Sequence, residues 1–233
     1  MTSLPSAKSA SAGRKSGKIR VLLIDDHAIL RQGLGQLINQ EPDMMVCGEA
    51  DEAPKGFEAV GALKPDVAVV DISLKGGNGL ELVKSIKASY PALPVLVLSM
   101  HDEALYAERV LRAGGLGYIM KEQAVESVLV AIRRVFKGEI VLSEKMQARL
   151  LHQLVSGRLK EGSSPVDTLT DRELEVFRMI GEGRSTRQIA EELHLSVRTV
   201  EAYREYIKEK LNLRNSTELV QQAFQWVHNG ALQ

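Results

Sequence analysis

The chain has 233 residues, of which 44% are hydrophobic and 26% are charged, so it is long enough for two globular domains with buried cores. Its 30 Lys and Arg balance its 30 Asp and Glu, so net charge alone indicates no nucleic-acid partner. No apolar run approaches the roughly 18 residues of a membrane span, and no apolar stretch follows the basic N-terminus as in a signal peptide. The lone Cys47 has no disulfide partner in the chain, so we expect a cytoplasmic protein without a membrane partner.

The first 138 residues divide into a polar tail and a region of alternating strands and helices. Residues 1–18 are rich in Ser, Ala, Lys and Gly, which predicts a disordered tail. After them come short apolar runs, three of them rich in β-branched residues and typical of strands buried on both faces of a parallel sheet. The predicted strands are Val21–Ile24, Met45–Ala50, Val67–Val70, Val95–Leu98 and Leu116–Met120.

Helical patterns separate these strands, and Gly138 is a candidate C-cap for the last of them. Five alternations of strand and helix predict an α/β domain over residues 19–138, with a five-stranded parallel, doubly wound (flavodoxin-like) sheet. The predicted helices are His27–Asn39, Glu52–Leu63, Leu80–Ser89, Glu103–Ala113 and Val125–Lys137.

The rest of the chain has no predicted strand. Residues 139–166 are predicted to be a linker that contains a helix at 143–155 and ends in a stretch rich in Gly and Ser. Residues 167–233 are predicted to form an all-α domain of four helices. Its expected caps are the capping boxes Thr170 with Glu173 and Ser185 with Gln188, then Ser196, then Asn215 or Ser216.

Charged side chains follow the predicted strands, at the edge where open α/β sheets carry their sites. Asp25 and Asp26 end the first strand, Asp71 follows the third, Ser99 follows the fourth and Lys121 follows the fifth. Three close carboxylates repel one another and favour a bound cation, and oxygen ligands favour Mg²⁺. A carboxylate beside Mg²⁺ can attack a phosphoryl group, with Lys121 and Ser99 holding the phosphoryl oxygens.

Two enzyme classes are less consistent with these residues. A phosphatase of the haloacid dehalogenase kind needs a second acid two residues after the nucleophile, where this chain has Ser73. A dinucleotide-binding domain needs a glycine-rich turn after the first strand, where this chain has Asp-Asp-His. We therefore do not expect an enzyme with a separate substrate.

Residues 19–138 resemble the receiver domains of two-component signalling. The resemblance lies in Asp25-Asp26, in Val-Val-Asp71-Ile-Ser-Leu, in Val-Leu-Ser99-Met and in Gly-Tyr118-Ile-Met-Lys121. It implies that Asp71 accepts a phosphoryl group from a sensor histidine kinase.

The resemblance also implies the cofactor and the movements that follow phosphorylation. Mg²⁺ would be held by Asp26, Asp71 and the backbone carbonyl of Ser73, with Asp25 assisting. Ser99 would move toward the phosphoryl group while Tyr118 rotates inward, which alters the face around the fourth helix and fifth strand. Lys75 departs from the family, which commonly has proline there.

The C-terminal pattern places a helix, a tight turn and a second helix over residues 187–211. Such helices can read the DNA major groove, but amphipathic helices mostly build cores, and periodicity alone does not decide between the two. Residues 167–233 carry nine Lys and Arg against eleven Asp and Glu, so any DNA contact must use a local patch. The predicted inner face consists of Ile189, Ala190, Leu193, Leu195 and Val200.

Residues 169–223 resemble the LuxR-type helix-turn-helix, in Leu169-Thr-Asp-Arg-Glu, Gly183-Arg-Ser-Thr-Arg-Gln-Ile-Ala and Ser196-Val-Arg-Thr-Val-Glu. Joined to a receiver, this motif is typical of the NarL/FixJ family of response regulators. Thr186, Glu201 and Tyr203 depart from common family residues, and Glu201 would offer an acceptor to cytosine N4. The implied DNA-binding residues are Thr186, Arg187, Ser196, Arg198, Thr199, Glu201, Ala202, Arg204, Glu205, Lys208 and Lys210.

The resemblance places a dimer contact on the last helix, at Leu219, Val220 and Ala223, and Trp226 either extends this contact or packs in the core. The expected function is phosphorylation-dependent binding to promoter DNA, as a homodimer when the protein is phosphorylated or DNA-bound. The unphosphorylated receiver would cover the DNA-binding helix or hold the wrong dimer geometry. Two alternatives are a phosphorelay or protein-interaction module without specific DNA binding, and a constitutive DNA binder with a vestigial receiver.

Overall fold

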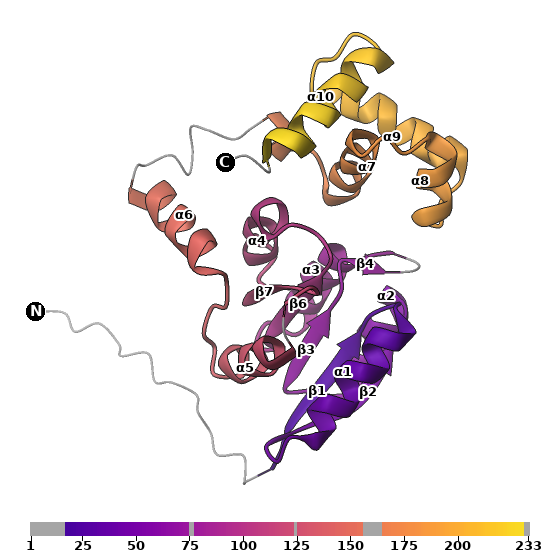
Figure 1. Cartoon of the computed structure of the whole chain (residues 1–233). Helices are drawn as coiled ribbons and strands as arrows, with labels where there is room; N and C mark the ends of the chain where they lie inside the picture. Colours follow the sequence, from indigo (N-terminus) through magenta and orange to yellow (C-terminus); the bar gives the residue numbers. More distant parts are fainter. Residues whose placement is uncertain (1–16, 75–76, 124, 156–164, 231–233) are drawn as a thin grey trace, which may run out of the picture.

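A computed structural model of the chain describes residues 17–74, 77–123, 125–155 and 165–230 (Figure 1). Lys75 and nearly all of the predicted tail at 1–18 lie outside these residues. Within the described residues, no helix combines the length and the apolar character needed to cross a bilayer.

The N-terminal domain is a five-stranded parallel sheet with strand order β2-β1-β3-β6-β7 (Figure 1). This order is that of flavodoxin-like folds, so the predicted fold class is confirmed. Strand bounds agree with the predictions to within two residues. The strands are β1 Ile19–Ile24, β2 Met44–Ala50, β3 Val67–Val70, β6 Val95–Ser99 and β7 Gly117–Met120. The helices of this domain are α1 Ala28–Gln40, α2 Ala53–Leu63, α3 Gly79–Ser89, α4 Glu103–Arg112 and α5 Val125–Phe136.

Helices cover both faces of this sheet. Helices α1 and α5 pack on one face with the alternate side chains of the strands, among them Leu23 and Leu96. Helices α2, α3 and α4 pack on the other face, against Leu22 and Val97. Because both faces are covered, all four residues of β3 are buried, as their β-branched composition predicts. Gly138 has φ +81°, the left-handed conformation expected of a C-cap glycine.

The C-terminal domain consists of helices, as predicted. After α6 Glu144–Val155, a short 3₁₀ helix η1 at Pro165–Thr168 leads into four α-helices. Both predicted capping boxes are present, Ser196 caps the third helix, and Asn215 rather than Ser216 precedes the fourth. Of the predicted inner face, Ile189, Ala190 and Val200 are buried, while Leu193 and Leu195 are half-buried and pack against the same core. The four helices are α7 Asp171–Gly181, α8 Thr186–Glu192, α9 Val197–Lys210 and α10 Ser216–Gly230.

Three short elements were not predicted. Strands β4 Ser73–Leu74 and β5 Gly77–Asn78 form an antiparallel hairpin after Asp71. Helix η1 lies where the end of the linker was expected, and Arg109 of α4 donates a hydrogen bond to the carbonyl of Val166 at 3.1 Å. The last residues before the C-terminal domain are therefore bound to the receiver-like domain.

The two domains contact each other through α7. Figure 1 shows α7 above α3 and α4, between the sheet and the rest of the C-terminal domain. One cluster of buried side chains runs from Tyr106 and Val110 of α4 through Val166 to Leu174 and Met179 of α7. The interface therefore has an apolar centre as well as the polar contacts described below.

Candidate functional site

The acidic groups predicted at the sheet edge do meet there. Strands β1 and β3 are neighbours, so Asp25 after β1 and Asp71 after β3 lie side by side, both buried. The ammonium of Lys121, which follows β7, lies between them: its Nζ is 2.7 Å from Asp71 Oδ2 and 2.7 Å from Asp25 Oδ2. The predicted convergence of groups from different strands is therefore observed.

The three carboxylates at this edge outnumber the one ammonium that pairs with them. Burial raises the pKa of Asp71 to about 6, with Lys121 opposing the rise and Asp25 adding to it. The buried atoms Asp71 Oδ1 and Asp26 Oδ1 have no hydrogen-bond partner among the described residues. Ligand atoms from Asp25, Asp26, His27 and Asp71 all lie within 4.8 Å of one another. The three carboxylates of this set fit a hard divalent cation such as Mg²⁺.

Ser99 and Tyr118, the predicted switch residues, are both buried beside this site. Ser99 Oγ accepts a hydrogen bond from the backbone N–H of His101 at 3.3 Å, and the Tyr118 hydroxyl donates one to the carbonyl of His101 at 2.7 Å. The resemblance implied that Tyr118 rotates inward after phosphorylation. In this structure its ring already lies inside, with 1% of its surface exposed, so the implied outward starting position is not observed.

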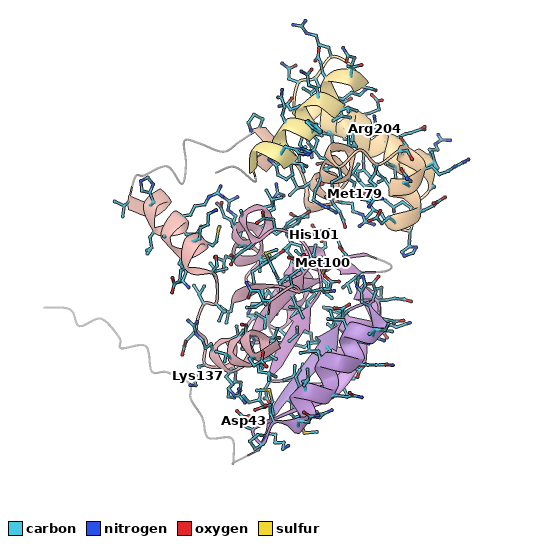
Figure 2. All side chains as sticks on the ribbon, in the orientation of Figure 1. Asp43, Met100, His101, Lys137, Met179 and Arg204 are labelled. Atoms are coloured by element: carbon cyan, nitrogen blue, oxygen red, sulfur yellow. The ribbon has the colours of Figure 1, made fainter. Side chains whose placement is uncertain are left out.

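His101 was not predicted as a site residue, although it follows β6 by only two positions. Its Nε2 lies 2.9 Å from Ser73 Oγ, and its ring stacks on Tyr106 of α4 at 5.0 Å. Burial, together with the positive charges of Arg178 and Lys121, lowers the pKa of His101 to about 3. Figure 2 shows His101 at the edge of the N-terminal domain that faces α7. This neutral imidazole therefore lies between the segment after Asp71 and the C-terminal domain.

The segment from Asp71 to Gly79 closes on itself. The Gly79 N–H donates to the carbonyl of Ile72 at 2.8 Å, and a Cβ at position 79 would lie 1.8 Å from the carbonyl oxygen of Asp71. Only glycine allows this approach. Asn78 caps α3 by accepting the Leu80 N–H at 2.8 Å.

A second group of acidic side chains lies on α7, and it binds cations of the N-terminal domain. Asp171 accepts from Lys84 Nζ of α3 at 2.7 Å and from Arg109 Nη1 of α4 at 3.0 Å. Glu175 accepts from Asn78 Nδ2 at 3.1 Å. The sequence analysis did not identify these residues, because their sequence separations of 62 to 97 leave no local pattern.

The predicted DNA-binding residues lie on α8 and α9, and most of them face solvent. Thr186, Thr199, Ala202, Arg204 and Lys208 are half-buried. Two of the cations have acidic partners: Lys208 pairs with Glu205 at 2.9 Å and Lys210 with Glu173 at 2.6 Å. The exposed members are Arg187, Ser196, Arg198, Glu201, Glu205 and Lys210.

The predicted dimer residues require a correction. Leu219 and Ala223 are fully buried, and a Cβ on Gly181 of α7 would lie 2.4 Å from the Ala223 carbonyl oxygen, so both residues pack inside their own domain. Only Val220 is exposed, together with Phe224 one turn later. Trp226 packs on Phe177 at 5.7 Å, which gives it a core role.

The domain families match these two structural units. Residues 21–133 match the response regulator receiver domain, and residues 167–223 match the bacterial regulatory proteins of the luxR family. The oxygen regulatory protein NreC of Staphylococcus aureus strain MRSA252 is 37% identical over 209 residues, which cover 88% of this chain and 96% of that protein.

Solved structures agree with this assignment. RcsB from Salmonella enterica serovar Typhimurium, bound to promoter P1flhDC with a phosphomimetic, is 26% identical with a TM-score of 0.58, over 89% of this chain and 98% of that one. A LuxR-family two-component regulator from Aurantimonas is 28% identical with a TM-score of 0.55, over 60% of this chain and 99% of that one. The chain therefore belongs to the response regulators of the NarL/FixJ type, in which a receiver domain precedes a LuxR-type helix-turn-helix.

Proposed function

We propose that Asp71 accepts a phosphoryl group from a sensor histidine kinase, and that this controls promoter binding by the helix-turn-helix domain. The observation that carries the proposal is the position of Lys121, whose ammonium touches Asp71 Oδ2 while Asp71 Oδ1 has no hydrogen-bond partner among the described residues. A carboxylate with one oxygen held and the other free is suited to attack phosphorus.

The transfer breaks the bond between phosphorus and a kinase histidine nitrogen and forms a bond between phosphorus and an Asp71 oxygen. Mg²⁺, held by Asp26, Asp71 and the Ser73 carbonyl with Asp25 assisting, would neutralise charge on the phosphoryl oxygens. Lys121 would bind a further phosphoryl oxygen. The Ser99 hydroxyl, at the end of β6, would move toward the phosphoryl group once it is attached. No separate substrate is turned over.

The interdomain contacts support control through docking of α7. Lys84, Arg109 and Asn78 all bind acidic side chains of α7 rather than residues of α9. On α9, Arg198, Glu201 and Glu205 stay exposed. Of the two ways in which the receiver could inhibit binding, holding the wrong dimer geometry is therefore favoured over direct covering of the DNA-binding helix.

Release of α7 would allow two copies to bind a twofold promoter site in the cytoplasm. The N-terminal half of α9 would meet base edges, and Arg187 and Arg198 would meet phosphates. Val220 and Phe224 would supply the apolar contact between copies on α10. The RcsB structure bound to promoter DNA supports the assignment of DNA as the partner.

The test begins with intact mass after incubation with Mg²⁺ and acetyl phosphate. We expect one phosphoryl adduct on the wild type and none on Asp71→Asn. Genomic fragments selected by the protein then provide an operator, whose affinity is compared with and without a beryllium fluoride phosphate mimic. Unchanged affinity and unchanged oligomeric state in the presence of the mimic would contradict the proposed control.

A phosphorelay module is the second candidate, favoured by the net negative charge of residues 167–233. It shares the adduct on Asp71 but predicts that no genomic fragment is enriched over competitor DNA. The fragment selection therefore separates the two functions.

A further inference from the structure

Asn78, at the end of β5, makes two buried hydrogen bonds with opposite roles. Its Oδ1 accepts the backbone N–H of Leu80 at 2.8 Å and so caps α3, while its Nδ2 donates to Glu175 Oε2 of α7 at 3.1 Å. Asn78 is 6% exposed and Glu175 is 1% exposed. Aspartate could supply the cap but not the donor, so the amide N–H is the part of this side chain that binds the other domain.

Glu175 extends this contact into the C-terminal domain. The same oxygen, Oε2, accepts a second hydrogen bond from Arg172 Nη1 at 2.7 Å. Arg172 also donates from Nη2 to the backbone carbonyl of Leu193 at 2.9 Å. Leu193 is the C-cap residue of α8 and begins the turn that leads into α9. Consecutive hydrogen bonds therefore run from Asn78 of the receiver to the turn of the helix-turn-helix.

The charge of Glu175 makes this contact depend on a neutral donor at position 78. The carboxylate is almost fully buried, and Arg172 of the same helix pairs with it. A carboxylate in place of the Asn78 amide would face Glu175 Oε2 across the distance of a hydrogen bond, so two negative charges would meet away from water. Their repulsion would favour separation of α7 from the receiver.

We propose that Asn78 and Glu175 form a latch, through which the receiver holds the turn of the helix-turn-helix by way of Arg172 while α7 is docked. This inference rests on the proposed control through α7 and names the contact that reaches the DNA-binding unit. Asn78 adjoins Gly79, where a Cβ would lie 1.8 Å from the Asp71 carbonyl oxygen, so the latch lies beside the segment that follows Asp71. Opening it would free α7 and the turn together.

Hydrogen exchange of the full chain, without phosphate or DNA, tests the latch. The variant is Asn78→Asp, which preserves the size of the side chain and the cap of α3. We expect exchange at α7 and at the turn between α8 and α9 to accelerate at least about tenfold, because a buried hydrogen bond is replaced by repulsion. The affinity for a selected operator, measured without the phosphate mimic, should rise toward the value that the wild type reaches with it.

The matched control is Asn39→Asp, which adds the same charge at an exposed site on α1 and keeps an acceptor for the Val46 N–H. It should leave the exchange at α7 and the operator affinity unchanged.

A second variant separates the latch from general damage to the fold. Asn78→Asp combined with Glu175→Gln exchanges donor and acceptor, so that the new amide can donate to the new carboxylate. We expect this double variant to recover at least about half of the protection that Asn78→Asp loses, because a hydrogen bond forms again between the same two positions. A residue with only a local structural role would not be rescued by a change on the other domain.

Three results would overturn the inference. The first is unchanged exchange at α7 in Asn78→Asp. The second is equal acceleration in the single and double variants, since the loss would then not depend on two carboxylates that meet. The third is faster exchange at α7 with an unchanged turn between α8 and α9, because the latch would then not hold the turn.

Failure of the latch can be told apart from failure of the proposed function. The exchange measurements need neither phosphate nor DNA, whereas the mass adduct tests Asp71 and the fragment selection tests DNA as a partner. Rescue by the double variant, together with no adduct on the wild type, would support the latch and contradict the proposed function. An adduct and a selected operator, together with unchanged exchange in Asn78→Asp, would do the reverse.

Discussion

Buried acidic side chains lie at the edge of the sheet and on α7, and these two groups differ in how their charges are balanced. At the edge of the sheet, Asp25 and Asp71 share the single ammonium of Lys121, and burial holds the pKa of Asp71 at about 6. On α7, Asp171 has two cationic partners, Lys84 and Arg109.

Glu173 on α7 shows how hydrogen-bond partners lower the pKa of a partly buried carboxyl group. Burial alone would raise its pKa, but hydrogen bonds from Lys210 and from the Thr170 backbone hold that pKa below its ordinary value. A carboxylate whose oxygens have partners stabilises the fold. A carboxylate left with an unpaired oxygen, as at Asp71, is available for a cation and for chemistry.

The largest expected effect comes from removing the charge of Asp171, which pairs with Lys84 and Arg109. Asp171→Asn leaves Arg109 and Lys84 facing a neutral group, and loss of one partner of a buried pair costs about 3–5 kcal/mol. We expect faster hydrogen exchange in α4 and α7 and a lower free energy of unfolding. Arg109→Gln, which leaves the first turn of α7 intact, should act in the same direction. Unchanged exchange in both variants would show that the charges do not hold the interface.

At the sheet edge, removal of a carboxylate charge should have the opposite effect and raise the free energy of unfolding. The folded-state pKa of Asp71, about 6, lies above its ordinary value of 3.8. The folded state therefore binds this proton more tightly, and stability is lost as the pH rises from about 4 to 6. With chelator present, Asp71→Asn should raise the free energy of unfolding at pH 8 by about 3 kcal/mol relative to its effect at pH 4. Urea unfolding at both pH values measures this, and a difference independent of pH would contradict it.

Lys121 sharpens the comparison because its ammonium contacts both Asp25 and Asp71. Lys121→Met removes charge stabilisation from the phosphoryl oxygens, and we expect phosphorylation of Asp71 by acetyl phosphate to slow about 100-fold. Intact mass against time measures the rate. Lys137→Met, after the end of α5, is the control. An equal phosphorylation rate in the two variants would show that Lys121 does not stabilise the phosphoryl oxygens.

The smallest effect is expected where both partners are exposed. Arg134 and Glu139 form an ion pair of 2.9 Å, and each side chain is more than 40% exposed. Glu139→Gln should change the free energy of unfolding by less than about 1 kcal/mol, because water screens the pair. A loss of unfolding free energy as large as that of Asp171→Asn would mean that burial does not decide how much an ion pair contributes to stability.

Local patterns in the sequence predicted most of the fold. Apolar runs such as Val67–Val70 and caps such as Thr170 depend on neighbouring residues, and the structure confirms them. The two-residue strands β4 and β5 are too short to show periodicity, so they were missed.

The site was predictable in part for the same reason. Strand ends identified Asp25, Asp71 and Lys121, because the topology of a parallel sheet brings those ends together. The partners of Asp171 were not predictable, since a surface charge does not indicate which distant residue it meets. The assignment of Leu219 to a dimer contact came from resemblance, and burial inside the domain overrides it.

Gly79 lies at the base of the hairpin that follows Asp71. A Cβ at this position would lie 1.8 Å from the Asp71 carbonyl oxygen, so only glycine allows the chain to pass this close to Asp71. Asn78, next to that base, holds Glu175 of α7. A series of contacts therefore joins Asp71 to α7 through Gly79 and its neighbour Asn78, and any larger side chain at position 79 would separate the first two.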